Sequence, residues 1–168
     1  MVEVVLRAVR VDVGSSTPLL LLEEVGGDRV LPIFIGAPEA TAIAYALQHV
    51  ATPRPMSHDL LGNVVSALGA KVFAVEIDDL IDNTFFASIR LLQGDQEVVV
   101  SARPSDAVAL ALRVGSPILV KDELMSEEPR LVLLDEDDDE DDEDIDADEL
   151  MAELRDFLDT VNPEDFDQ

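Results

Sequence analysis

Eight residues suited to binding or transferring charged groups stand at the predicted starts of three helices. Arg103-Pro104-Ser105-Asp106 joins a valine-rich strand to an apolar helix, and Arg54-Pro55-Met56-Ser57-His58-Asp59 precedes a second helix. Glu39 follows Gly36-Ala37-Pro38 at the start of a third. A helix N-terminus attracts anions and arginine offers five donors in a fork, so we expect any site to lie here. The two Arg-Pro helix starts are expected to converge on one cleft.

The acidic side chains and the histidine of this set are suited to two kinds of chemistry. Oxygen ligands bind Mg²⁺ or Mn²⁺, and Glu39, Asp59 and Asp106 are the candidate ligands. His58 is the candidate general base. The alternative is structural: acids in a first helical turn complement the helix dipole, and His58 hydrogen-bonds to a neighbouring element.

The two arginines before proline also have two interpretations. Arg54 and Arg103 suit bidentate contact with a phosphate. Alternatively, each forms a buried ion pair, Arg103 with Asp59 or Arg54 with Asp106, that locks the two helix starts together.

The helices and strands that must position these residues follow from hydrophobic periodicity. Strands are predicted over residues 2–13, 19–25, 29–35, 71–80, 84–92, 97–102 and 117–121. One helix is predicted to begin at residues 36–39, a second to span residues 57–68 and a third to follow Pro104. Ser57 and Ser105 are predicted to cap the second and third helices, and the alternative role for both is contact with a substrate. Val98, Val99 and Val100 predict a buried strand, and a core-facing stripe is predicted for the helix over 57–68 (Leu60, Leu61, Val64, Val65 and Leu68). Segregated hairpins and helices indicate an α+β fold with a mixed or antiparallel sheet of about seven strands and three packed helices.

Charge is distributed unevenly along the chain. Residues 1–134 carry 10 basic and 18 acidic residues, a balance of −8, whereas residues 135–168 carry 1 and 19, a balance of −18. An acidic body without a basic run argues against tight, non-specific binding to nucleic acid. The absence of cysteine excludes disulfides and thiolate metal sites. No organic cofactor is expected. The sequence has neither a long apolar run nor a signal-peptide pattern, which predicts a cytoplasmic protein.

The charge pattern predicts three parts: a domain over residues 1–130, an acidic disordered linker over 131–146 and an amphipathic C-terminal helix over 147–168. Residues 135–144 are all Asp or Glu, and such a run cannot pack. After it, apolar residues recur at helical spacing: Ile145, Leu150, Met151, Leu154, Phe157, Leu158 and Val161. This segment has three candidate docking partners: its own domain, a neighbouring subunit or a basic protein surface.

Four stretches together resemble the bifunctional nuclease family of bacteria and plants, also described as a domain of unknown function. They are Leu31–Ala40, Pro53–Leu61, Asp82–Ala87 and Ala102–Arg113, in this order. The resemblance covers roughly residues 2–126, and the tail resembles C-terminal extensions of actinobacterial members. Two departures stand out: Phe86 replaces the tyrosine of the family's Gly-Thr-Phe-Tyr, and Met56-Ser57 replaces Leu-Thr.

The resemblance implies an α+β fold, a dimer, and DNase and RNase activity. Our first hypothesis is therefore a metal-assisted nuclease, with His58, Asp59, Arg103 and Asp106 as its catalytic residues and with Arg54 contacting phosphate. The second hypothesis is a non-enzymatic regulatory or interaction module, whose acidic tail binds a basic partner or blocks its own site. The acidic charge favours weak nucleic-acid binding in either case.

Overall fold

The computed structural model describes residues 1–12 and 15–125. Its strands are β1 (Val2–Asp12), β2 (Thr17–Glu24), β3 (Val30–Phe34), β4 (Ala70–Ile81), β5 (Thr84–Gln93), β6 (Gln96–Ala102) and β7 (Ile118–Val120). Its helices are α1 (Ala37–Leu47), α2 (Ser57–Ala67), α3 (Pro104–Val114) and a short 3₁₀ turn, Asp122–Leu124. The predicted order of elements is confirmed for this part of the chain.

One mixed sheet contains all seven described strands, in the order β3-β2-β1-β7-β4-β5-β6. Only the pairing of β4 with β7 is parallel among the described strands. The longest strands form two hairpins, β1-β2 and β4-β5. The turn between β4 and β5 consists of two residues with positive φ, Asp82 at 48° and Asn83 at 60°. Pro32 lies in the edge strand β3, where a missing N–H costs no sheet hydrogen bond. The α+β fold is confirmed.

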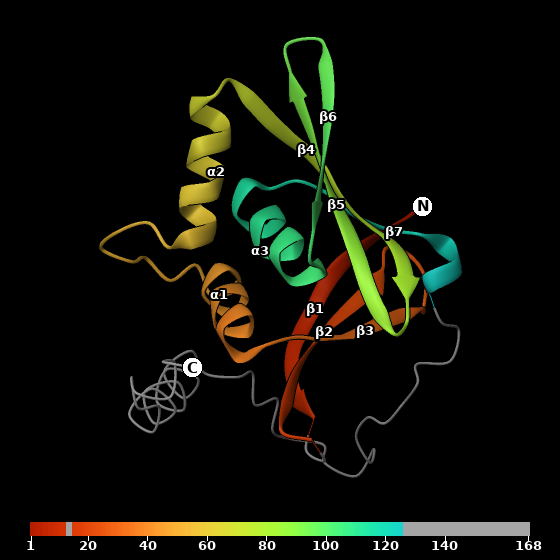
Figure 1. Cartoon of the computed structure of the whole chain (residues 1–168). Coiled ribbons are helices and arrows are strands. Elements are labelled where there is room, and N and C mark those ends of the chain that lie inside the picture. The colour runs from red at the N-terminus through yellow and green to blue at the C-terminus, as the bar shows by residue number, and fades with distance from the viewer. Residues whose placement is uncertain (13–14, 126–168) are drawn as a thin grey trace, which may run out of the picture.

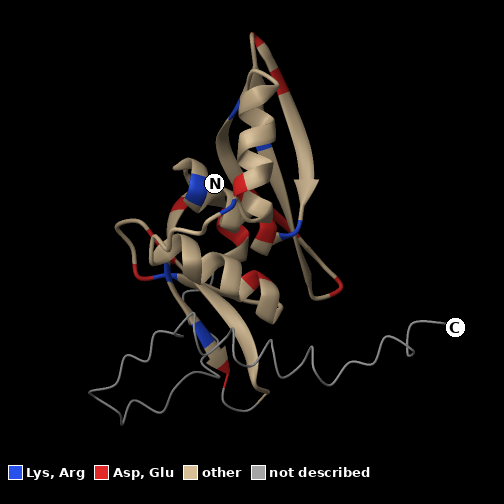
Figure 2. Ribbon diagram, turned by 90° about the vertical axis from the view of Figure 1, so that its left-hand side faces the viewer, with Lys and Arg blue, Asp and Glu red and all other residues tan. Residues whose placement is uncertain are grey.

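The three helices gather beside the sheet, with α3 between α1, α2 and the strands (Figure 1). Helix α3 is buried from Pro104 to Ala111 except at Asp106, because its Ala, Val and Leu residues leave almost no polar face. Helix α2 is the outermost of the three and faces the viewer in Figure 2. Gly115 ends α3 with a φ of 67°, a conformation that glycine adopts without strain.

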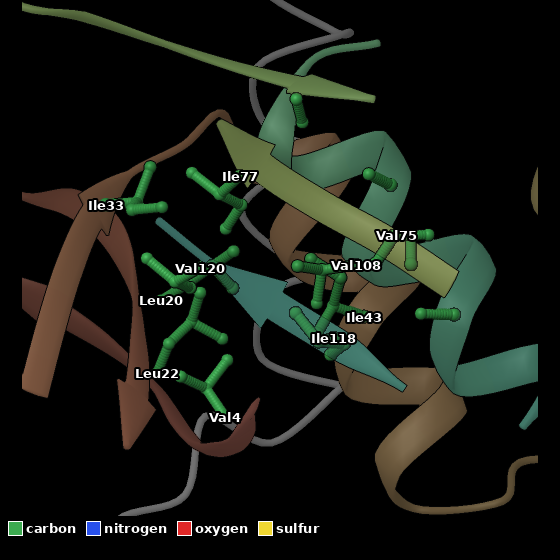
Figure 3. Packing of buried hydrophobic residues seen from close by; sticks show 14 of the residues in the cluster. Val4, Leu20, Leu22, Ile33, Ile43, Val75, Ile77, Val108, Ile118 and Val120 are labelled. Atoms are coloured by element: carbon green, nitrogen blue, oxygen red, sulfur yellow. The ribbon is translucent and has the colours of Figure 1, made fainter. Parts of the chain in front are cut away.

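The core lies between α3, α1 and the middle of the sheet (Figure 3). Leu20 and Leu22 from β2 meet Val120 from β7, and Ile43 from α1 lies close to Val108 from α3. The leucine run of β2 is buried on both faces of the sheet. This packing fixes the start of α3 relative to the other two helices.

Two predictions about burial are wrong. Strand β6 is an edge strand, so Val98, Val99 and Val100 are 39–54% exposed rather than buried. In α2, the face predicted for the core points largely to solvent, and the buried residue of this helix is Gly62. Gly62 packs on α3, where a Cβ would lie 3.2 Å from Cγ1 of Val114, so α2 contacts the core through Gly62 and the half-buried Val65.

The predicted linker and C-terminal helix lie outside the described residues. Among the helices of the described part, none is long and apolar enough to cross a membrane.

Candidate functional site at three helix starts

The first turns of α1 and α3 begin without a side-chain cap, whereas at the start of α2 the Asp59 carboxylate accepts the backbone N–H of Met56. The N-cap residues of the three helices are Gly36, Met56 and Arg103, and none of these makes a capping hydrogen bond through its side chain. The predicted caps Ser57 and Ser105 are therefore wrong, because both residues already lie inside their helices. Uncapped first turns leave N–H groups and the positive end of each helix dipole available to an anion.

A chain of polar contacts joins these three helix starts. His58 Nε2 of α2 lies 3.1 Å from Asp106 Oδ1 of α3. Arg103 Nε donates to Asp106 Oδ2 at 2.7 Å, and Arg103 Nη2 lies 2.8 Å from Glu39 Oε1 of α1. The two Arg-Pro helix starts therefore converge, as expected, through the contact of His58 with Asp106. The start of α1 joins them through the contact of Glu39 with Arg103.

The site combines a sheltered histidine with an exposed arginine. The His58 side chain is 13% exposed and that of Arg103 is 66% exposed. Burial disfavours the charged form of Asp106, but hydrogen bonds from Arg103 and His58 outweigh it and hold its pKa below the usual value. Asp106 in turn raises the pKa of Arg103, as does Glu39, so this guanidinium stays charged.

A second ion pair, between Arg113 of α3 and Asp59 of α2, holds these two helices together next to the site. Arg113 Nε donates to Asp59 Oδ1 at 2.6 Å, and its Nη atoms donate to the carbonyl oxygens of Ala109 and Ala42 at 2.9 and 2.8 Å. Asp59 Oδ2 also accepts the Met56 N–H at 2.8 Å. Burial works against the Asp59 charge, but these two donors lower its pKa.

This second pair corrects the predicted ion pairs. The structure pairs Arg103 with Asp106 and Glu39, not with Asp59, and it pairs Asp59 with Arg113. Arg113 was not among the sequence candidates. A single arginine at the end of an otherwise apolar, buried helix is the signal that could have identified it.

The remaining candidates lie around this junction. Arg54 is exposed in the loop before α2, and its guanidinium has no carboxylate partner within the described residues. Ser57 is exposed and Ser105 is buried at the start of α3. Two open grooves of about 270 and 510 Å³ flank the Asp59–Arg113 pair, and His58 lines the larger one.

The carboxylates as placed do not form a ready-made metal site. Glu39 and Asp106 are both held by Arg103, whereas Asp59 belongs to the pair with Arg113. Within residues 1–12 and 15–125, no three His, Cys, Asp or Glu side chains are grouped closely enough to hold an ion together. The predicted ligand set therefore remains a prediction.

Comparison with known proteins identifies the family. The sequence model of the bifunctional nuclease domain matches residues 20–131. An uncharacterized protein of Mycobacterium tuberculosis is 44% identical over 164 residues, which cover 98% of this chain and 97% of that protein.

Plant relatives match a smaller share of the chain. Bifunctional nuclease 1 of Oryza sativa subsp. indica is 28% identical over 105 residues, covering 61% of this chain and 32% of the rice protein. Bifunctional nuclease 2 of Arabidopsis thaliana is 29% identical over 109 residues, covering 63% and 33% respectively. The chain thus spans about a third of these plant proteins. Given the domain match over residues 20–131, the chain belongs to the bifunctional nuclease domain family.

Proposed function

We propose that this protein is a nuclease that hydrolyses phosphodiester bonds at the junction of the three helix starts. The observation that carries the proposal is the contact of His58 with Asp106, 3.1 Å apart and next to the exposed Arg103. A base, an orienting carboxylate and a phosphate-binding cation within one set of contacts are the groups that this reaction requires. Family membership supports the same chemistry.

His58 would act as the general base. If Nε2 donates its hydrogen to Asp106, the lone pair of Nδ1 is free to accept a proton from water, and Asp106 stabilises the imidazolium that forms. The oxygen of that water bonds to phosphorus while the bond from phosphorus to one ester oxygen breaks. The departing alkoxide takes a proton from the surrounding water, and the His58 imidazolium afterwards returns its proton to the solvent. His58 lines the groove of about 510 Å³, and a substrate would reach this ring through that groove.

Arg103 would bind the phosphate. Its Nε and Nη2 contact the two carboxylates, which leaves the Nη1 hydrogens for a phosphate oxygen, and its exposure keeps the guanidinium accessible. The uncapped start of α3 adds backbone N–H groups at the same position. The exposed Arg54 and Ser57 are proposed as further substrate contacts, whereas the predicted contact through Ser105 is disfavoured because this residue is buried.

A divalent ion, Mg²⁺ or Mn²⁺, remains a possible cofactor of the proposed reaction. Because Glu39 and Asp106 both contact Arg103, an ion there would have to displace the guanidinium, and no step above is assigned to it. Cleavage measured with Mg²⁺, with Mn²⁺ and with EDTA tests this requirement directly.

The decisive experiment for the function compares the full chain with its Arg103→Ala/Asp106→Ala variant on labelled single- and double-stranded DNA and RNA. The proposal predicts cleavage by the parent chain and its loss in the variant, with circular dichroism showing that both are folded. If the folded variant keeps full activity, the site is elsewhere. If the parent chain cleaves none of these substrates, the nuclease proposal fails.

A second candidate is a non-enzymatic regulatory module. Two carboxylates neutralise Arg103, and Phe86 lacks the hydroxyl of the family's tyrosine, so both features weaken the case for phosphate chemistry. In this case the acidic tail would bind a basic protein surface, and the motif residues would hold three helices together. Dimerisation and a cytoplasmic location are expected under both candidates, and sedimentation and cell fractionation test them.

A further inference from the structure

Helix α2 presents an apolar stripe to solvent. Leu60, Leu61, Val64 and Leu68 are 39–67% exposed, and their spacing places them on one side of the helix, away from Gly62 and α3. Single exposed leucines are ordinary, but four large apolar side chains on one helix face indicate a docking surface. We call these four residues the α2 stripe.

Basic residues flank helix α2 in the sequence. Arg54 precedes α2 and Lys71 follows it, both are exposed, and neither has an ion-pair partner within the described residues. The one charged residue of α2 itself, Asp59, is held by Arg113. Figure 2 shows this helix as uncharged along its length apart from its first turn. The stripe therefore suits an apolar partner that carries negative charge.

The C-terminal part of the same chain has this chemistry. Between residues 145 and 161 it carries six acidic residues and one basic residue. Its apolar residues recur every three or four positions: Leu150, Met151, Leu154, Phe157, Leu158 and Val161. As a helix, residues 150–161 would be about 18 Å long, compared with about 16 Å for α2.

We propose that residues 145–161 dock on the α2 stripe of their own chain, with the acidic side chains of that segment beside Arg54 and Lys71. The 19 residues from 126 to 144 can span roughly 60 Å, whereas a body of this size has a radius of gyration of roughly 14 Å. A tether of this kind supplies an effective concentration on the order of millimolar. The proposal does not depend on nuclease activity.

Two further observations favour this occupant over a second copy of the body. Two α2 stripes packed antiparallel would bring Arg54 of one copy towards Lys71 of the other, and like charges oppose such a contact. The mycobacterial relative matches 98% of this chain, so the C-terminal segment accompanies the body in that protein.

Disulfide trapping in the full chain tests the proposal, because the chain contains no cysteine. Val64→Cys is combined with Leu154→Cys or with Phe157→Cys, and mild oxidation is followed on non-reducing gels. We expect an intramolecular cross-link, at a rate independent of protein concentration, at least five-fold faster than in a control that carries Val99→Cys in place of Val64→Cys. Val99 is 54% exposed on β6, outside the stripe.

Two outcomes overturn the proposal: cross-linking no faster than in the Val99 control, and cross-linking that yields mainly dimers. The dimer result would assign the stripe to a neighbouring copy instead.

Tryptophan fluorescence gives an independent readout, because the chain has no tryptophan. Phe157→Trp should emit as a shielded indole, and adding Leu60→Ser/Leu68→Ser should shift the emission to that of an exposed one. Val99→Ser should leave it unchanged, and circular dichroism checks that each variant is folded. An indole that is already exposed in the Phe157→Trp chain also contradicts the proposal.

Discussion

Replacing Arg113 with methionine tests how the three helices are held together. The Arg113 side chain is 9% exposed, and it joins α3 to Asp59 of α2 and to the Ala42 carbonyl of α1. Methionine has a similar length without the charge, so the substitution removes these bonds and leaves the Asp59 carboxylate with the Met56 N–H alone among the partners described above.

The expected loss can be estimated from these contacts. Removing one partner of a buried ion pair costs about 3–5 kcal/mol, and hydrogen bonds to charged groups contribute about 1.5–3 kcal/mol each. Asp59 is 35% exposed and water will compensate part of the loss, so we expect about 3 kcal/mol. For a body of this size that corresponds to a fall in Tm of about 12 °C.

Urea and thermal unfolding, followed by circular dichroism, measure this loss. Arg113→Lys keeps the charge but not the fork, so it should lose about half as much. Arg7→Met is the matched control, because Arg7 makes an exposed ion pair with Glu23 and should lose less than about 1 kcal/mol. If Arg113→Met costs no more than Arg7→Met, then Arg113 does not hold the helices together and this reasoning is refuted.

Three further predictions follow from the same contacts. Gly62→Leu should lower the free energy of unfolding by about 1–3 kcal/mol, because its side chain would meet Val114, and Asn63→Leu, exposed on the same helix, should not; equal urea midpoints would contradict this packing. The pKa values of Asp59 and Asp106 are lowered in the folded protein, so both carboxylates should stabilise the fold above their unfolded pKa of about 3.9 and cease to do so as the pH falls through the folded values. Between pH 7 and pH 3 the urea midpoint should therefore fall less in Asp106→Asn than in the parent chain. An equal fall of the midpoint in both proteins would contradict the pairing. A chain ending at Leu134 should bind labelled single-stranded DNA more tightly than the full chain at low salt and equally at high salt; equal affinity at both would exclude self-inhibition by the tail.

The fold was largely predictable because its signals are local. Strand patterns act within a few residues, and the structure confirms the predicted strands; the turn at Asp82-Asn83 and the glycine that ends α3 are equally local features. The burial of β6 and α2 was not predictable from periodicity. A period shows that a face is apolar, but not whether another element covers it, and here α2 packs through Gly62 and leaves its leucines outside.

The site was predictable in position and less so in pairing. The Arg-Pro motifs at predicted helix starts identified His58, Arg103 and Asp106, which the structure brings into contact. The partner of Asp59 is Arg113, 54 residues further along the chain, and only the packing of α3 between α1 and α2 determines that contact. Pairing over such a separation leaves no pattern in a single sequence.

Comparing His58→Ala with His49→Ala is the most direct test of the account, which places the cleavage site at the three helix starts. His49 follows α1 and is exposed, without a contact to Asp106, so its loss should leave the activity unchanged. Initial rates of cleavage of labelled DNA and RNA by the full chain give kcat/KM for each variant. Loss of a general base predicts a fall of about 100-fold or more for His58→Ala, measured at a temperature where circular dichroism shows the variant to be folded. A folded His58→Ala variant that cleaves as fast as His49→Ala would contradict the account.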